Sequence, residues 1–320
     1  MVATLALASC ATADPPASPH PPSARPSGGP SASPSLPVTT PARLFGTNMP
    51  LFDANEQMLT NPGTRAVLRA WQIPFIRVPF RRALSDGVEL SALEVIRDIG
   101  AQPMVIVQGA TDENALADDV HELQLVASVF GADTVDVEYG NEEDVAGVDA
   151  VRYTQSWNAV VPTLTSQHPT YKFVGPVNFQ WNPPYIAYFV AHAKPAPNYV
   201  SWHEYVCDPS ASSDYCTQHI ARWAVHVAET NAAERGAIGH TVPFFISEWN
   251  MDGSADPRYS DPMMIGPWTA RAIAELESQI PHGLAGAMQY CADSHGDGFQ
   301  LIDADDHLTP QGRAFWLSTP

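Results

Sequence analysis

Two carboxylates in this 320-residue sequence stand where short apolar segments end, and together they could carry acid–base chemistry. Glu142 follows Asn141 at the end of TVDVEYGN (134–141), and Glu248 stands near the end of VPFFISEWN (242–250). Hydrolysis of a glycosidic bond requires two facing carboxyl groups: a protonated one donates to the leaving oxygen, and an ionised one attacks or activates water. Each acid alone could equally be an exposed loop residue, so the pair matters only if the fold brings the two together.

Eight apolar segments recur from residue 44 onward, and each is typical of a parallel strand that is buried on both faces. Segments with apolar residues at helical spacing separate most of them. Eight strands followed by helices over about 275 residues predict a single α/β domain, a (β/α)8 or TIM barrel. A doubly wound open sheet is the alternative, but GTNMPLFD after the first strand is not the glycine-rich turn that such folds usually carry. The expected strands are 44–48, 74–80, 102–109, 134–141, 171–178, 199–206, 242–250 and 283–291, and the expected helices are 91–99, 113–130, 152–167, 185–193, 219–233 and 266–280, with a closing helix near 308–316.

The active site of a TIM barrel forms at the C-terminal ends of its strands, so this fold would place Glu142 and Glu248 on one rim. Side chains alternate along a strand, which puts Glu138 inside the barrel and Tyr139 toward the helices. On the same alternation we expect Glu142 one layer above Glu138. We also expect Arg77 to point inward, within hydrogen-bonding reach of a rim or inner carboxylate.

This pattern resembles clan A of the glycoside hydrolases, which are retaining enzymes on a TIM barrel, with family 39-like proteins nearest and cellulase-like members also similar. The resemblance rests on EYGNE (138–142), on Glu248, and on three further matches: Asn48 in GTN, Arg77 in IRVPF, and His203 with Tyr205 in HEY. It implies that Glu142 is the acid/base and Glu248 the nucleophile. It also implies that Asn141 contacts the sugar 2-hydroxyl, and that His203 and Tyr205 orient and tune the two carboxylates.

Aromatic residues could add sugar contacts. We expect Trp249, beside Glu248, in the substrate site, and Trp181 in NFQWNPPY either stacks on a sugar face or packs within its loop. Cellulase-like members usually carry a Trp at the end of strand eight, where this chain has MQYCADSHGDG. The tryptophans at 157, 223 and 268 fall in helical segments and are expected in the core, and Trp316 is expected to pack. The acidic loop 293–306, with His295, could contact substrate or, less favourably, bind a metal ion.

The N-terminus predicts export rather than folded structure. Residues 1–10 end in Leu-Ala-Ser-Cys, which resembles a bacterial lipobox with Cys10 as the lipidated residue, although no Lys or Arg precedes the short apolar run. Residues 11–42 hold ten prolines and six serines between Pro15 and Pro41, which predicts a disordered spacer. We therefore expect a catalytic domain over 43–320, tethered outside the cell by a lipid anchor at the bacterial membrane. A chance Cys in a ragged terminus is the alternative.

The other cysteines fit an oxidising compartment. Cys207 and Cys216 enclose a short polar segment, CDPSASSDYC, which predicts a disulfide that shapes a wall of the cleft. Cys291 lies in an apolar run and is expected to be a buried thiol.

Composition and missing motifs exclude several function classes. A net charge of −19, a pI of about 4.7 and no basic stripe argue against a nucleic-acid partner. There is no Gly-x-Ser-x-Gly motif of a serine hydrolase, and WHEYVC (202–207) lacks the second His of a zinc protease. We expect a monomer that binds carbohydrate and needs no cofactor or metal. A non-catalytic carbohydrate-binding barrel and a transglycosylase remain alternatives to the hydrolase.

Overall fold

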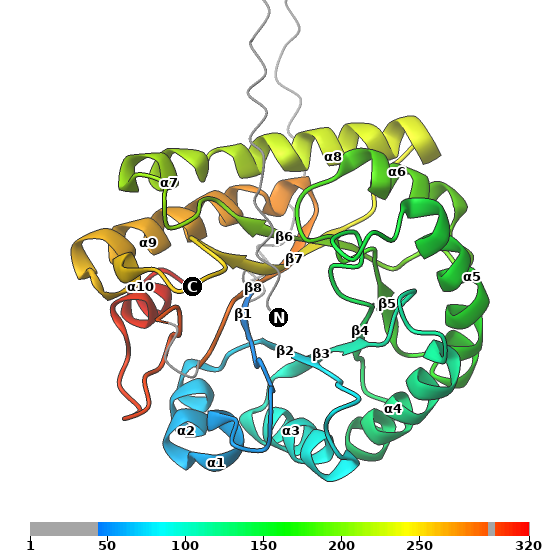
Figure 1. Cartoon of the computed structure of the whole chain (residues 1–320), viewed down its shortest axis with the longest axis horizontal. Helices are drawn as coiled ribbons and strands as arrows, with labels where there is room; N and C mark the ends of the chain where they lie inside the picture. Colours follow the sequence, from blue (N-terminus) through cyan, green and yellow to red (C-terminus); the bar gives the residue numbers. More distant parts are fainter. Residues whose placement is uncertain (1–43, 294–297, 320) are drawn as a thin grey trace, which may run out of the picture. The chain divides into compact units, whose positions relative to one another are not determined.

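The computed structural model describes residues 44–293 and 298–319, and its eight strands are arranged as one ring (Figure 1). Cys10, the segments 1–10 and 11–42 and His295 lie outside the described residues, so the predictions made on them stay predictions. The described residues contain no helix that is long and apolar enough to cross a membrane.

The sheet is parallel throughout and follows the order β5-β4-β3-β2-β1-β8-β7-β6. Isolated bridges from Val174 to Tyr199 and from Asn178 to Trp202 connect β5 with β6 and close the ring. The predicted (β/α)8 barrel is therefore confirmed. The strands are β1 (Phe45–Asn48), β2 (Phe75–Pro79), β3 (Gln102–Val107), β4 (Asp136–Tyr139), β5 (Lys172–Val174), β6 (Val200–Tyr205), β7 (Phe244–Asn250) and β8 (Leu284–Gln289).

Helices surround the strands, and all those expected from periodicity are present (Figure 1). Three helices were not predicted: α1, α2 and α7. The helix α2 begins at Asn61-Pro62-Gly63, which reads as a turn, but here Asn61 caps the helix by accepting from the backbone N–H of Gly63. The helices are α1 (Gln57–Thr60), α2 (Pro62–Trp71), α3 (Asp86–Ile99), α4 (Ala115–Phe130), α5 (Ala150–Gln167), α6 (Pro183–His192), α7 (Ser213–His219), α8 (Arg222–Ile238), α9 (Pro262–Ser278) and α10 (Pro310–Ser318), with 3-10 turns at Pro257–Ser260 and Ile280–His282.

The core lies between the strands and the helices, as the alternation along β4 predicts. Tyr139 points outward, where its hydroxyl meets Ser156 of α5 and its ring packs edge-on against Trp157. The tryptophans at 157, 223 and 268 are buried, as expected. Trp316 stacks on Trp71 but keeps 42% of its surface exposed, so its packing is one-sided.

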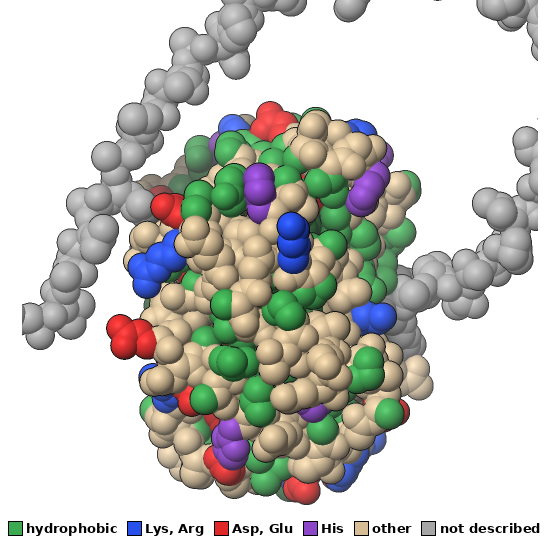
Figure 2. All heavy atoms as spheres, turned by 90° about the vertical axis from the view of Figure 1, so that its right-hand side faces the viewer, with side chains coloured by type: hydrophobic (Ala, Val, Ile, Leu, Met, Phe, Trp, Pro, Cys, Tyr) green, Lys and Arg blue, Asp and Glu red, His purple; other side chains and the backbone are tan. Residues whose placement is uncertain are grey.

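The surface carries no concentration of positive charge on the face that Figure 2 shows. Acidic, basic and hydrophobic side chains are scattered there among polar ones. This face therefore offers no stripe along which a phosphate backbone could lie.

Candidate active site

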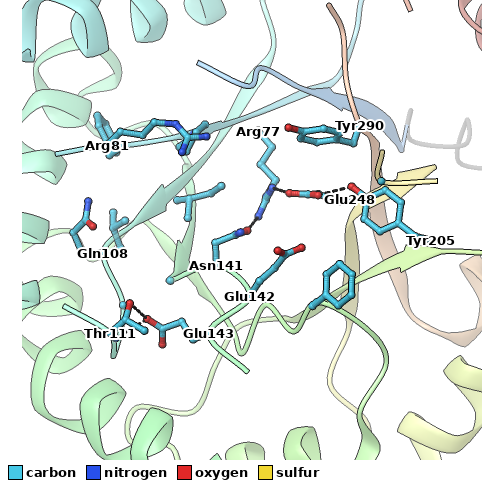
Figure 3. A pocket seen from close by; sticks show the side chains of 18 residues that line it. Arg77, Arg81, Gln108, Thr111, Asn141, Glu142, Glu143, Tyr205, Glu248 and Tyr290 are labelled. Atoms are coloured by element: carbon cyan, nitrogen blue, oxygen red, sulfur yellow. Dashed lines mark hydrogen bonds and ion pairs between the residues drawn. The ribbon is translucent and has the colours of Figure 1, made fainter. Parts of the chain in front are cut away.

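A buried arginine organises the rim of the barrel. Arg77, on β2, is 1% exposed and donates from Nε to Glu138 (2.5 Å) and from Nη1 to Glu248 (2.6 Å). It also donates from Nη1 to Asn48 (3.0 Å) and from Nη2 to Asn141 (2.6 Å), so four side chains accept from one guanidinium. Figure 3 shows Arg77 between Asn141 and Glu248. The expectation that Arg77 reaches a rim or inner carboxylate is confirmed.

Glu142 reaches the cavity through a turn, not by continuing the strand. The strand β4 ends at Tyr139, and Gly140 (φ 78°) and Glu142 (φ 52°) both adopt the left-handed region. This conformation is unfavourable for a residue with a Cβ. A backbone hydrogen bond from Glu142 to Val177 (2.9 Å) helps to hold it. The alternation that predicts the place of Glu138 therefore stops at Gly140, and the turn aims Glu142 into the cavity.

Glu142 and Glu248 lie close together, and His203 lies between them. The Nδ1 atom of His203 is 2.6 Å from Glu142 Oε1 and 3.6 Å from Glu248 Oε2. The nearest potential ligand atoms of these three side chains all lie within 4.8 Å of one another. His203 is opposite Glu248 in the register of β6 and β7, which fixes this contact. Tyr205, two residues further along β6, donates its hydroxyl to Glu248 Oε2 (2.6 Å).

The surroundings keep Glu248 ionised. Burial alone would raise the pKa of Glu248, but His203, Arg77 and the hydroxyl of Tyr205 outweigh burial and lower that pKa below its usual value. Burial alone would lower the pKa of His203, yet Glu248 and Glu142 raise it. Burial and the negative Glu248 raise the pKa of Tyr205, so its phenol stays protonated and remains a donor. The site thus pairs a stabilised carboxylate with a second carboxyl that is more open: the side chain of Glu142 is 27% exposed and that of Glu248 10%.

The same three side chains are chemically able to ligate a metal ion, since His and carboxylates are common ligands. Arg77 argues against that use. Its guanidinium already occupies Oε1 of Glu248 and Tyr205 occupies Oε2, so a cation bound there would displace one donor and lie against a positive charge. We therefore interpret the cluster as an acid–base site.

A cavity of about 410 Å³ opens above this cluster. Five of the predicted site residues line it: Arg77, Asn141, Glu142, Tyr205 and Glu248. Four do not line it: Asn48, Trp181, His203 and Trp249. Asn48 and His203 are buried beneath the lining, where both contact Arg77.

The two tryptophans lie away from the cavity. Trp249 is fully buried and packs against Trp223, Trp268 and Phe315 on the helical side of β7. The expectation that it contacts substrate is wrong, because neighbouring residues of a strand face opposite ways and Glu248 takes the inner face. Trp181 stacks on His226 of α8 (4.4 Å between ring centroids), so its ring packs within the fold rather than in the cavity.

The sequence pattern does not reveal several of the residues that line the cavity. Tyr290 follows β8 and lines the cavity where cellulase-like proteins usually carry a Trp. Glu143 accepts from the backbone N–H (2.8 Å) and hydroxyl (3.0 Å) of Thr111, and burial raises its pKa. Arg81, two residues after β2, also lines the cavity. Glu143 directly follows Glu142, which the pattern does select, and Arg81 precedes the exposed Arg82. The spacing of Glu143 and Arg81 in the sequence therefore does not mark them as site residues.

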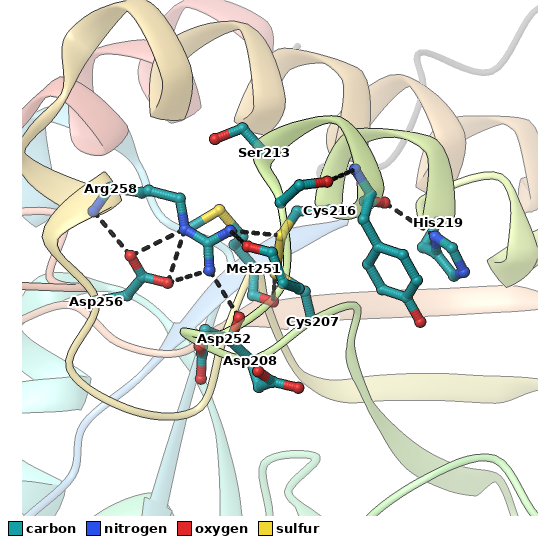
Figure 4. Close-up of a disulfide and its surroundings, with 12 residues drawn as sticks. Cys207, Asp208, Ser213, Cys216, His219, Met251, Asp252, Asp256 and Arg258 are labelled. Carbon is teal, nitrogen blue, oxygen red and sulfur yellow. Dashed lines mark hydrogen bonds and ion pairs between the residues drawn. A yellow bond between two sulfur atoms is a disulfide. The ribbon is translucent and has the colours of Figure 1, made fainter. Parts of the chain in front are cut away.

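The predicted disulfide between Cys207 and Cys216 is present (Figure 4). It packs behind the site, where Arg258 donates to the Sγ atom of Cys216 (2.9 Å) and to the backbone oxygens of Ala211 and Asp208. No residue from 207 to 216 lines the cavity, so the expected role as a cleft wall is wrong. Cys291 is a buried thiol, as expected, and it donates to the backbone oxygen of Asp293 (2.7 Å).

No known family model matches the sequence, and no curated protein matches it. Solved structures do match. A glucosidase from Croceicoccus marinus aligns with a TM-score of 0.64 and 15% identity over 89% of this chain and 68% of that chain. A GH39 enzyme from Xanthomonas axonopodis pv. citri gives 0.59 and 16% over 86% and 65%. A GH5_18 protein from Streptomyces cattleya, in complex with Manβ1-4GlcNAc, gives 0.60 and 15% over 87% and 80%. Structural neighbours of this chain are thus clan A glycoside hydrolases, and at these identities the likeness establishes the barrel fold.

Proposed function

We propose that this chain is a retaining O-glycoside hydrolase in which Glu142 is the acid/base and Glu248 the nucleophile. The observation that carries the proposal is the close approach of these two carboxyl groups in one cavity, with nearest oxygens within 4.8 Å. Retaining enzymes hold their carboxyls about 5–5.5 Å apart, whereas inverting enzymes need about 6.5–9.5 Å to admit a water molecule. The spacing supports the retaining mechanism, and the glycosidase neighbours support the substrate class.

In the first step, an oxygen of Glu248 attacks the anomeric carbon while Glu142 donates its proton to the leaving oxygen, so the glycosidic bond breaks and a glycosyl ester forms. In the second step, Glu142 accepts a proton from water, whose oxygen attacks the anomeric carbon and releases Glu248. Glu142 Oε1 is held by His203, which leaves Oε2 for the leaving group. Arg77 and Tyr205 fix both oxygens of Glu248 and keep the carboxylate ready to attack.

Two variants test the assignment on a panel of aryl glycosides. Glu248→Ala should abolish turnover because no ester can form. Glu142→Ala should slow turnover by roughly 10²–10⁴-fold, least for the best leaving groups, and added azide should restore part of the rate. Glu94→Ala, on the exposed face of α3, is the matched control and should leave activity unchanged.

The alternatives predict different results on the same panel. Sugar binding without turnover by the unaltered protein would indicate a carbohydrate-binding barrel and contradict the hydrolase. Transfer of the glycosyl group to an added sugar, with little free sugar released, would indicate a transglycosylase that uses the same residues.

We also propose that the enzyme acts outside the cell on an oligo- or polysaccharide, tethered by a lipid on Cys10 and a spacer over 11–42. The support is the lipobox-like sequence, the proline-rich spacer and the presence of a disulfide.

A further inference from the structure

Arg81 brings to the cavity a positive charge that forms no ion pair with the described residues. It follows β2 by two residues, is half-buried and lines the cavity. Among residues 44–293 and 298–319, no carboxylate lies within 4.0 Å of its guanidinium, although the chain carries 35 Asp and Glu against 16 Lys and Arg. Partial burial lowers the pKa of Arg81 and the positive charge of Arg77 lowers it further, while Tyr290, Glu248 and Glu56 act in the opposite direction.

Neutral backbone oxygens hold this side chain by one edge. Nε donates to Leu51 (3.0 Å) and Nη2 to Pro50 (3.0 Å), and the guanidinium lies over the ring of Phe52 (4.9 Å to the centroid). These bonds use Nε and one hydrogen of Nη2, and Nη1 makes no hydrogen bond to the described residues, so the edge formed by Nη1 and the second hydrogen of Nη2 keeps its donors. That edge has the geometry that binds a carboxylate with two hydrogen bonds.

The other cation of the cavity cannot play this part. Every nitrogen of Arg77 already contacts a side chain, and burial, which alone would lower its pKa, is outweighed by Glu138 and Glu248, which raise it. Of the two arginines that line the cavity, Arg81 is therefore the one that still has hydrogen-bond donors available for a ligand. Figure 3 shows its guanidinium on the Gln108 side of the cavity, reaching toward Arg77 and the rim carboxylates.

Resting on the proposed glycosidase function, we propose that Arg81 binds the carboxylate of an acidic sugar, so that the substrate is a uronoside. A neutral sugar needs hydroxyl partners but no fixed cation. A bound carboxylate would neutralise the partly desolvated guanidinium and would give the enzyme local attraction for an anion, against the repulsion of a chain with net charge −19.

The test compares matched pairs of aryl glycosides that differ only at C6: glucuronide with glucoside, galacturonide with galactoside, and iduronide with idoside. The 6-sulfate of each neutral glycoside is a third substrate in every set. The readout is the ratio of kcat/KM for the acidic member to that for its neutral counterpart, which does not depend on the fraction of protein that folds. The unaltered enzyme should prefer one uronoside by at least about 10-fold. Arg81→Gln should lower kcat/KM for that uronoside by roughly 10- to 100-fold, the usual loss of a charge-assisted bidentate pair, and change the neutral partner by less than about 3-fold.

Arg81→Lys should fall between the two, because it keeps the charge and loses the fork. Arg97→Gln, an exposed position on α3, is the matched control. A preference for neutral glycosides, or an equal loss on both members of a pair in Arg81→Gln, would overturn the inference and leave the hydrolase standing. A preference for the 6-sulfate over the carboxylate would overturn the uronoside assignment.

If no glycoside is cleaved, the proposed hydrolase fails, and the inference about Arg81 is then tested by binding alone. The experiment is calorimetric titration of the unaltered protein with free uronic acids and with neutral sugars. Tighter binding of a uronic acid supports the inference, and equal or no binding refutes it.

Discussion

Replacing Arg77 with Met tests whether the rim is held by charge. Arg77 and Glu138 are 1% and 0% exposed, so Arg77→Met would leave Glu138 buried without its cation and would remove one of the two donors on Glu248. Breaking a buried ion pair by removing one partner costs about 3–5 kcal/mol, because the remaining charge stays desolvated. At roughly 2–4 °C per kcal/mol for a domain approaching this size, the midpoint of thermal unfolding should fall by about 6–20 °C at pH 7.

The assay is thermal unfolding followed by circular dichroism, with two comparisons. Arg97→Met breaks the exposed pair with Asp98 and should change stability by less than about 1 kcal/mol. The double variant Arg77→Met/Glu138→Leu removes both charges and should be more stable than Arg77→Met alone, because no carboxylate is left unpaired at position 138. An Arg77→Met protein that melts within about 2 °C of the unaltered one, or a double variant no more stable than the single, would refute the reasoning.

Two further predictions concern pH and the envelope. Burial raises the pKa of Asp119 to about 9, so the folded chain keeps a proton that the unfolded chain releases, and stability falls as pH rises between about 4 and 9. Asp119→Asn should therefore raise the unfolding midpoint at pH 8.5 and change it little at pH 4.5, and an equal effect at both pH values would contradict this. Cys10→Ala should release the protein from membranes into the medium, which fractionation and immunoblotting would show, and unchanged fractionation would count against the anchor.

The barrel could be predicted because its strands are buried on both faces and therefore appear as continuous apolar runs. The exceptions follow the same logic. The helix α2 begins with Asn-Pro-Gly, where the cap that starts the helix has the composition of a turn. The short helix α7 begins inside the polar segment between Cys207 and Cys216, where no long apolar stripe marks it.

The sequence identifies residues of the site only where they lie at the end of a predicted strand. Glu142 and Glu248 could be chosen because both follow apolar runs on the same edge of the sheet. Trp249 stands next to Glu248 in the sequence, but the alternation of side chains along β7 turns it toward the helices. Arg81 and Tyr290 lie just past the ends of β2 and β8, where the alternation of side chains along a strand no longer determines which way a residue points.

The two bridges between β5 and β6 have a consequence for how the acid is held. They are isolated bridges, whereas every other neighbouring pair of strands shares a ladder, and the junction lies in the middle of the sequence, opposite the joined β1 and β8. Glu142 is tied by its backbone to Val177 on one side, and His203 to Asn178 on the other. The segment that follows β5 thus anchors both the acid and its histidine, whereas the nucleophile depends on β7, Arg77 and Tyr205, so the two carboxyls are positioned by separate parts of the chain.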